Sequence, residues 1–171
     1  MLGHKAFKLL TLNDKNEVYG TLRSENDIKK YFSESKYCRN IFSGIDALNT
    51  NSVLALIDEL SPDLVLNCIG IIKQLKESQN PLLSIEINSL FPHKLATHLE
   101  GSKTRLIHIS TDCVFSGEKG NYLETDYSDA KDLYGKTKFL GELTSYKNSI
   151  TLRTSIIGPE LKSKVLSLIH I

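Results

Sequence analysis

The sequence predicts an α/β fold in which a parallel, doubly wound sheet is flanked by helices. Short apolar runs rich in β-branched residues alternate with stretches whose apolar residues recur at helical spacing. Strands separated by helices of this length are typical of βαβ units, whose sheets are parallel. The length of 171 residues fits one domain with its own core.

The first half of the chain predicts three strands and two helices in alternation. The helix before the third strand is the clearest, because Val53, Leu56 and Leu60 fall on one helical face. Ser61-Pro62 ends it, since the residue before proline disfavours helical backbone. In chain order the expected elements are a strand at Glu17–Leu22, a helix at Asn26–Ser33, a strand at Arg39–Phe42, a helix at Ser52–Leu60 and a strand at Asp63–Cys68.

The second half repeats the alternation. Asn80-Pro81 predicts an N-cap followed by proline in the first helical turn, and Gly101 is a good C-cap. This helix should run to about Glu100 with a break at Phe91-Pro92. The remaining expected elements are a strand at Thr104–Ile109, a helix at Lys131–Tyr146 and a strand at Ile150–Arg153.

Both ends of the chain depart from a complete sheet of this kind. A helical apolar pattern begins at Ala6 with no strand before it, whereas doubly wound sheets normally open on a central strand and a glycine turn. We therefore expect the first strand to be absent. The residues Leu166–Ile171 fit no pattern in the chain, and we expect 166–171 to be a non-native tail.

Composition excludes several classes of function. With 21 Lys and Arg against 20 Asp and Glu, the net charge of +1 argues against nucleic acid as the main partner. No apolar run reaches the ~18–20 residues that span a bilayer, so we expect no membrane partner. Three scattered cysteines make no disulfide framework, which indicates the cytoplasm. His93 and His98 fall on different sides of a helix, and no metal site is expected.

Three motifs could carry chemistry. Tyr134 and Lys138 are four residues apart on a predicted helix, which places phenol and ammonium on one face. A neighbouring cation favours the phenolate and would lower the pKa of the tyrosine. Hydroxyl side chains follow a strand in Ile109–Phe115, and Leu66–Gly70 ends another, at the sheet edge where ligands bind in open α/β sheets. Each motif alone also fits an ordinary helix face or turn.

Taken together, six ordered blocks resemble the extended short-chain dehydrogenase/reductase family, and within it the dTDP-4-dehydrorhamnose reductases and related sugar-nucleotide reductases. The resemblance implies a Rossmann-type NAD(P)-binding domain over residues 1–165, lacking its first strand and most of the substrate-binding portion. The blocks are PDLVLNCIG (Pro62–Gly70), INSLFPHKLA (Ile87–Ala96), HISTDCVFSG (His108–Gly117), YLETD (Tyr122–Asp126), YGKTKFLGE (Tyr134–Glu142) and LRTSIIGP (Leu152–Pro159).

The resemblance implies a catalytic set of Thr111, Tyr134 and Lys138. Thr111 would hydrogen-bond the substrate carbonyl, and Tyr134 would protonate its oxygen as hydride arrives. Lys138 would hold the nicotinamide ribose and lower the pKa of the tyrosine. The family's helix asparagine matches Asn88, for which a purely structural role is equally open.

The same resemblance implies a nicotinamide cofactor. Arginine at position 23, where a carboxylate would favour NAD, suits a 2′-phosphate and favours NADPH, with NADH possible. Tyr134 and Lys138 would contact the cofactor as well. The other residues implied are Leu2 and Gly3 from the glycine turn, Arg23, Asp46 near the adenine, and the wall Asn67, Cys68, Ile69 and Gly70.

The implied substrate is a nucleotide-activated deoxysugar in the synthesis of polysaccharide precursors, in contact with Thr111, Asp112, Cys113 and Ile156. The reductases usually have an aromatic residue in place of Cys113 and a tryptophan in place of Ile156, so the sugar stays open. Two alternatives stand beside the reductase. One is an epimerase or dehydratase of the same family, and the other is a non-catalytic NADP-binding regulatory subunit.

For the isolated chain we expect poor stability and no activity. The resemblance implies a homodimer for the full-length protein.

Overall fold

The computed structural model describes residues 2–32, 40–156, 158–159 and 166–167. They form two compact units, Leu54–Ser155 and a second unit made of the residues before Leu54 and after Ser155. The boundary falls inside helix α4 (Thr50–Leu60). The expectation of one domain over 1–165 stays a prediction, and positions 168–171 of the expected tail lie outside the described residues.

The larger unit is built on a three-stranded parallel sheet in the order β3-β4-β5. Its strands are β3 (Leu64–Asn67), β4 (Arg105–Thr111) and β5 (Ser149–Thr154), which confirm the predictions for this part of the chain. Asn67 pairs with His108 in the register, and Thr111 pairs with Thr154. All three strands therefore end at one edge of the sheet.

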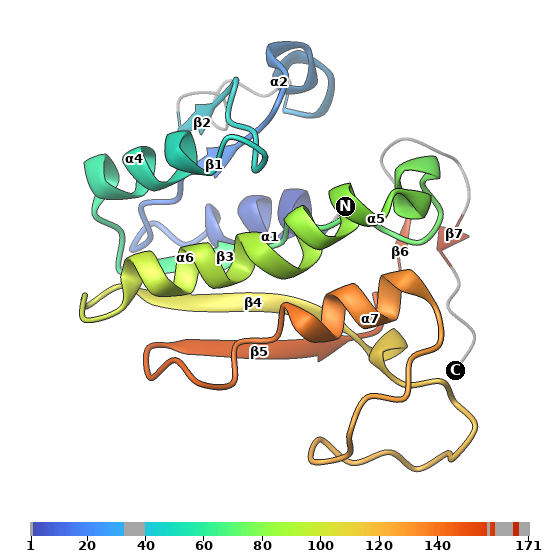
Figure 1. Cartoon of the computed structure of the whole chain (residues 1–171). Coiled ribbons are helices and arrows are strands. Elements are labelled where there is room, and N and C mark those ends of the chain that lie inside the picture. Colours follow the sequence, from blue (N-terminus) through green and yellow to red (C-terminus); the bar gives the residue numbers. More distant parts are fainter. Residues whose placement is uncertain (1, 33–39, 157, 160–165, 168–171) are drawn as a thin grey trace. The chain divides into compact units, whose positions relative to one another are not determined.

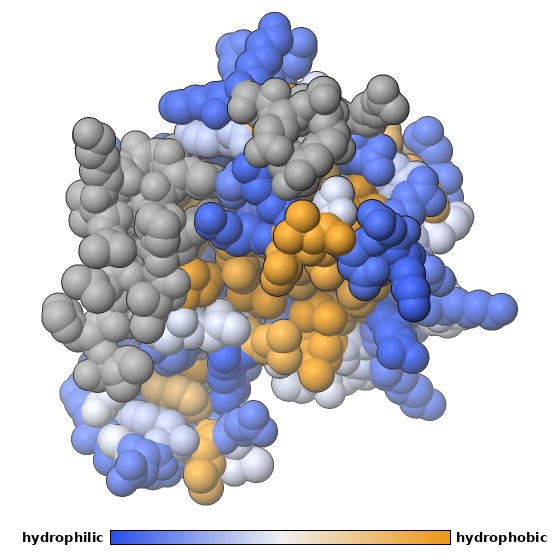
Figure 2. Space-filling model, turned by 180° about the vertical axis from the view of Figure 1, so that it is seen from behind, coloured by the Kyte–Doolittle hydropathy of each residue, from blue (hydrophilic) through white to orange (hydrophobic). Residues whose placement is uncertain are grey.

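Helices cover one face of this sheet (Figure 1). They are α6 (Phe91–Leu99) and α7 (Leu133–Leu140), and α5 (Pro81–Ser84) and the π-helix η2 (Ile85–Leu90) lead into α6 and pack against α7. Alternation along β4 places Leu106, His108 and Ser110 in the buried layer. On the strands, Leu64, Ile150 and Leu152 are exposed. The side opposite α6 and α7 shows gathered apolar surface (Figure 2).

Two helical predictions need correction. The expected break at Phe91-Pro92 is absent, because Pro92 stands in the first turn of α6 and helical backbone continues into it from η2. The helix expected to reach Tyr146 ends at Leu140, with Gly141 as its C-cap. Asn80 caps α5 as predicted, its side chain accepting the Leu83 N–H at 3.2 Å.

The smaller unit contains α1 (Leu2–Leu10), α2 (Glu25–Tyr31) and the parallel pair β1 (Gly20–Thr21) and β2 (Ile41–Phe42). Phe7 and Phe32 form its buried core, in edge-to-face contact with ring centroids 5.5 Å apart. Two short antiparallel segments, β6 (Gly158–Pro159) and β7 (Leu166–Ser167), also belong to it. In the described residues no strand precedes α1.

Short turns complete the larger unit. They are the 3-10 helices η1 (Lys76–Gln79) and η3 (Asp112–Val114).

Candidate functional site

The candidate site lies where β3 and β4 end beside α7 (Figure 1). Thr111 is the last residue of β4, and Asn67 is the last residue of β3. Tyr134 and Lys138 stand one turn apart on α7. The structure thus gathers the predicted catalytic residues at the sheet edge where ligands bind in open α/β folds.

Two glycines allow α7 to reach this position. A Cβ at Gly135 would lie 2.2 Å from the carbonyl oxygen of Cys113, and one at Gly141 would lie 1.9 Å from that of Asn88. Any larger side chain would force the helix away from η3 or η2. The start of α7 is fixed by Asp132, whose carboxylate accepts the Gly135 N–H at 2.7 Å.

Thr111 is buried, and its Oγ1 accepts the Cys113 N–H at 3.2 Å while donating to Asp112 Oδ1 at 3.2 Å. Burial raises the pKa of Tyr134, and hydrogen bonding with Thr111 offsets this only in part. The expectation that a neighbouring cation lowers the pKa of this phenol is therefore wrong here: burial is the largest influence, and the carboxylates of Asp112 and Asp132 also raise the pKa. A phenol with a raised pKa remains protonated and can act as an acid.

Lys138 is almost fully buried, with 4 % of its surface exposed. Its Nζ donates to the Ile109 carbonyl at 2.7 Å and lies 3.4 Å from His108 Nε2. Burial lowers the pKa of Lys138 to about 8, against the opposing effects of Glu142 and Cys68. This lysine therefore changes charge close to physiological pH.

His108 is a site residue that the sequence did not single out. It is fully buried, and burial together with Lys138 lowers its pKa to about 3. Its Nδ1 lies 3.1 Å from Asn67 Nδ2. The sequence held one signal for it, a histidine at a buried position of a strand that ends in hydroxyl residues.

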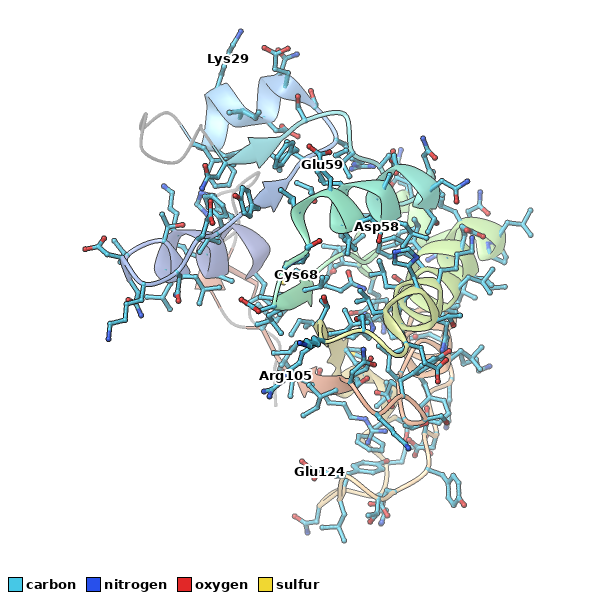
Figure 3. The ribbon with its side chains drawn as sticks, turned by 90° about the vertical axis from the view of Figure 1, so that its left-hand side faces the viewer. Lys29, Asp58, Glu59, Cys68, Arg105 and Glu124 are labelled. Atoms are coloured by element: carbon cyan, nitrogen blue, oxygen red, sulfur yellow. The ribbon has the colours of Figure 1, made fainter. Side chains whose placement is uncertain are left out.

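The predicted wall after β3 borders the same site. Cys68 directly follows the strand (Figure 3), and burial raises the pKa of its thiol. Ile69 and Gly70 are exposed, and a Cβ at Gly70 would lie 3.3 Å from Asn88 Oδ1 and 3.7 Å from Lys138 Nζ. The glycine therefore lets this part of the wall approach Asn88 and Lys138 closely.

Asn88 ties this wall to α7. Its Oδ1 accepts the Ile71 N–H at 2.8 Å, and its Nδ2 donates to the Ile71 carbonyl at 3.2 Å and to Thr137 Oγ1 at 3.3 Å. The side chain is fully buried in η2. Single π-helical turns are frequent at functional sites, and here the turn sets the distance between the wall and the lysine helix.

An exposed ion pair at the same site was also missed. Lys73 Nζ lies 2.6 Å from Asp132 Oδ2, and both groups act electrostatically on Cys113. Burial raises the pKa of Cys113, which fits a packing residue better than a reactive thiol. Asp112 and Cys113 are half-buried beside Thr111, where the sequence analysis places the substrate.

Five predicted site residues belong to the smaller unit, and their part in the site stays a prediction. Arg23 is exposed just after β1. Asp46 is half-buried and accepts the Leu48 N–H at 3.0 Å, which closes a turn. The other three, all half-buried, are Leu2, Gly3 and Ile156.

The described part of the chain has neither a metal-binding cluster nor a membrane-spanning helix. No group of three or more His, Cys, Asp or Glu side chains there could hold a metal ion. No helix there is long and apolar enough to cross a membrane.

The model of the RmlD substrate binding domain family matches residues 10–167 of this chain. The chain is similar to the "Probable low-salt glycan biosynthesis reductase Agl14" of Haloferax volcanii, with 33 % identity over 128 residues, covering 73 % of this chain and 43 % of that protein. It is also similar to the dTDP-4-dehydrorhamnose reductase of Aggregatibacter actinomycetemcomitans, with 33 % identity over 120 residues, 67 % of this chain and 40 % of that protein.

A third relative has a different kind of name. Methionine adenosyltransferase 2 subunit beta of Bos taurus is 28 % identical over 124 residues, covering 71 % of this chain and 37 % of that protein. The chain thus spans about two fifths of the length of the curated relatives it matches.

Among solved structures, the dTDP-4-dehydrorhamnose reductase of Bacillus anthracis in complex with NADP shares the fold. Its TM-score is 0.60 at 20 % identity, and the match covers 81 % of this chain and 54 % of that one.

Proposed function

This chain belongs to the RmlD substrate binding domain family, and from that membership we propose that the full-length protein is an NADPH-dependent reductase. Its substrate would carry a keto group on a nucleotide-activated deoxysugar, of the kind named for the similar dTDP-4-dehydrorhamnose reductase. The observation that carries the proposal is the grouping of Thr111, Tyr134 and Lys138 where the sheet ends beside the exposed residues Ile69 and Gly70.

The residues of the larger unit fit the nicotinamide end of such a cofactor. Lys138 would hold ribose hydroxyls through its Nζ, and Gly70 would let the ligand lie against the backbone. When bound, the reduced nicotinamide supplies the hydride.

In this reaction two side chains of the protein act on the substrate carbonyl. Thr111 orients and polarises the substrate carbonyl by donating its hydroxyl proton in place of the bond to Asp112. Tyr134 gives its phenolic proton to the carbonyl oxygen as that oxygen becomes negative, and its raised pKa keeps the proton available until then. Lys138 stands one helical turn away, close to Gly70.

The proposal is tested by NADPH oxidation in the full-length protein with a panel of nucleotide-linked keto sugars. Turnover of at least one member, lost in Thr111→Val, is the expected result. No turnover of any member by a protein that binds NADPH would favour the second candidate, a regulatory subunit.

The second candidate has one specific observation behind it, the likeness to the methionine adenosyltransferase subunit. Against it stand the three catalytic-type side chains, which a regulatory role would not require. An epimerase of the same family would show isomerisation of a nucleotide sugar with no net oxidation of NADPH.

The preference for NADPH rests on Arg23 and is tested separately. Loss of a charged hydrogen bond to a 2′-phosphate costs about 1.5–3 kcal/mol, so Arg23→Ala should raise KM for NADPH by roughly tenfold or more. The KM for NADH should stay unchanged in the same variant. Arg105→Ala, at an exposed arginine of the sheet, is the matched control and should leave both constants unchanged.

A further inference from the structure

A chain of hydrogen bonds runs from the backbone after β3 to the buried lysine of the site. The Ile69 N–H donates to Asn67 Oδ1 at 3.0 Å. Because a backbone N–H can only donate, it fixes the amide of Asn67 with its oxygen toward Ile69. The Nδ2 of Asn67, a pure donor, then faces His108 Nδ1 at 3.1 Å.

This arrangement decides where the imidazole proton lies. Nδ1 must accept from Asn67, so it carries no proton. Burial keeps the ring neutral, since the fully buried imidazolium would have no water around it. The one proton of the neutral ring therefore resides on Nε2, which faces Lys138 Nζ at 3.4 Å.

The Nε2–H of His108 can donate a hydrogen bond to a neutral amine but not to an ammonium. A neutral Lys138 has a lone pair for this proton and still donates to the Ile109 carbonyl at 2.7 Å. A charged Lys138 has no lone pair, and the N–H dipole of His108 would point its positive end at the cation.

We propose that Asn67 and His108 are positioning residues that bias Lys138 toward its neutral amine by fixing the imidazole tautomer. Burial also favours the neutral amine, but the charged and titratable groups that act on Lys138 do not. Glu142 and Cys68 both favour the ammonium. His93 acts on His108 by disfavouring the imidazolium, and Tyr134 lies one turn back on the same helix.

The effect of the Asn67–His108 pair on turnover rests on the proposed function, whereas the tautomer of His108 does not depend on it. A lysine poised in this way can lose and regain a proton within the working pH range, and Asn67 and His108 add to the effect of burial on the ratio of its two forms.

The first test is the ¹⁵N spectrum of the histidine rings in the full-length protein without cofactor, with His108 assigned by its loss in His108→Gln. We expect a neutral ring protonated on Nε2. A ring protonated on Nδ1 would overturn the inference.

The second test follows the Cε signal of Lys138 through a pH titration. Asn67→Ala removes the donor to Nδ1 without adding charge, and Asn67→Asp presents an acceptor that draws the proton to Nδ1. In both, Nε2 becomes free to accept from the ammonium, and the pKa of Lys138 should rise by about one unit, a tenfold change in the ratio of its forms.

The control is His98→Gln, at a histidine paired with Asp58 away from this chain of hydrogen bonds, which should leave Lys138 unchanged. Titration of Lys138 at the same pH in wild type and in both Asn67 variants would contradict the proposal. Failure of NADPH turnover with the expected tautomer and titration would count against the proposed function alone.

Discussion

Glu142 is the most deeply buried member of an ion pair in the described residues, and its replacement by glutamine should destabilise the protein. The carboxylate accepts from Arg153 Nε at 2.9 Å, from Arg153 Nη2 at 2.7 Å and from Ser110 Oγ at 2.9 Å. Its side chain is 4 % exposed and that of Arg153 is 22 % exposed. The pair joins β5 to the residues that follow α7.

The magnitude follows from what the substitution leaves behind. Removing one partner of a buried ion pair typically costs 3–5 kcal/mol, roughly, because the other charge stays without compensation. Arg153 keeps partial solvent contact, its bond to the Glu124 carbonyl at 3.1 Å and its position over the Phe115 ring. Figure 3 shows Glu124 in the loop that precedes α7. We therefore expect Glu142→Gln to lower the free energy of unfolding by about 3 kcal/mol.

The assay is equilibrium urea unfolding of the full-length protein. With a slope of about 2 kcal/mol per molar urea, the midpoint should fall by about 1.5 M at unchanged slope. The matched control is Glu86→Gln, which breaks an ion pair of 2.6 Å with Lys94 whose side chains are 30 % and 44 % exposed, and should cost less than about 1 kcal/mol.

A double variant separates charge from packing. Glu142→Leu with Arg153→Met removes both charges and should recover at least half of the loss. A Glu142→Gln midpoint equal to that of Glu86→Gln would refute the reasoning.

Two further predictions concern packing and pH. Gly141→Ala places a Cβ 1.9 Å from the Asn88 carbonyl oxygen and should lower the free energy of unfolding by about 3 kcal/mol or more, which is measured as a fall in Tm. The control is Lys136→Ala, at an exposed position of the same helix. Equal Tm values for the two variants would contradict the close approach. The pKa of His108 is about 3 in the folded protein against 6.5 for a free histidine, so the unfolded state binds more protons between these values. The contribution of His108 to the free energy of unfolding should be complete above pH 6.5 and should be lost as the pH falls toward 3. The urea midpoint should therefore fall less steeply with pH in His108→Gln than in wild type, and an equally steep fall would contradict a buried neutral ring.

Much of the fold was accessible from the sequence because its signals are local. Strands β3, β4 and β5 stand out as short apolar runs, and Asn80-Pro81 marks its helix start by cap chemistry alone. The same holds for Thr111, Tyr134 and Lys138, whose motifs and order could be recognised without coordinates.

What the sequence could not provide depends on contacts between distant residues. Helix α7 ends at Gly141, which lies so close to the Asn88 carbonyl that a Cβ there would clash, and no helical pattern encodes this approach. The direction in which the pKa of Tyr134 shifts could not be predicted without knowing how deeply the phenol is buried. The role of His108 required the strand register that pairs it with Asn67.

The central claim is that Tyr134 is the proton donor of an NADPH-dependent keto-sugar reductase. Its most direct test is Tyr134→Phe in the full-length protein, with NADPH affinity and turnover of the best keto-sugar nucleotide measured side by side. We predict a Kd for NADPH within a few-fold of wild type, since Tyr134 is one of several implied cofactor contacts, and a kcat reduced by at least about 10²-fold, the usual contribution of a positioned acid. Turnover within a few-fold of wild type would contradict the account.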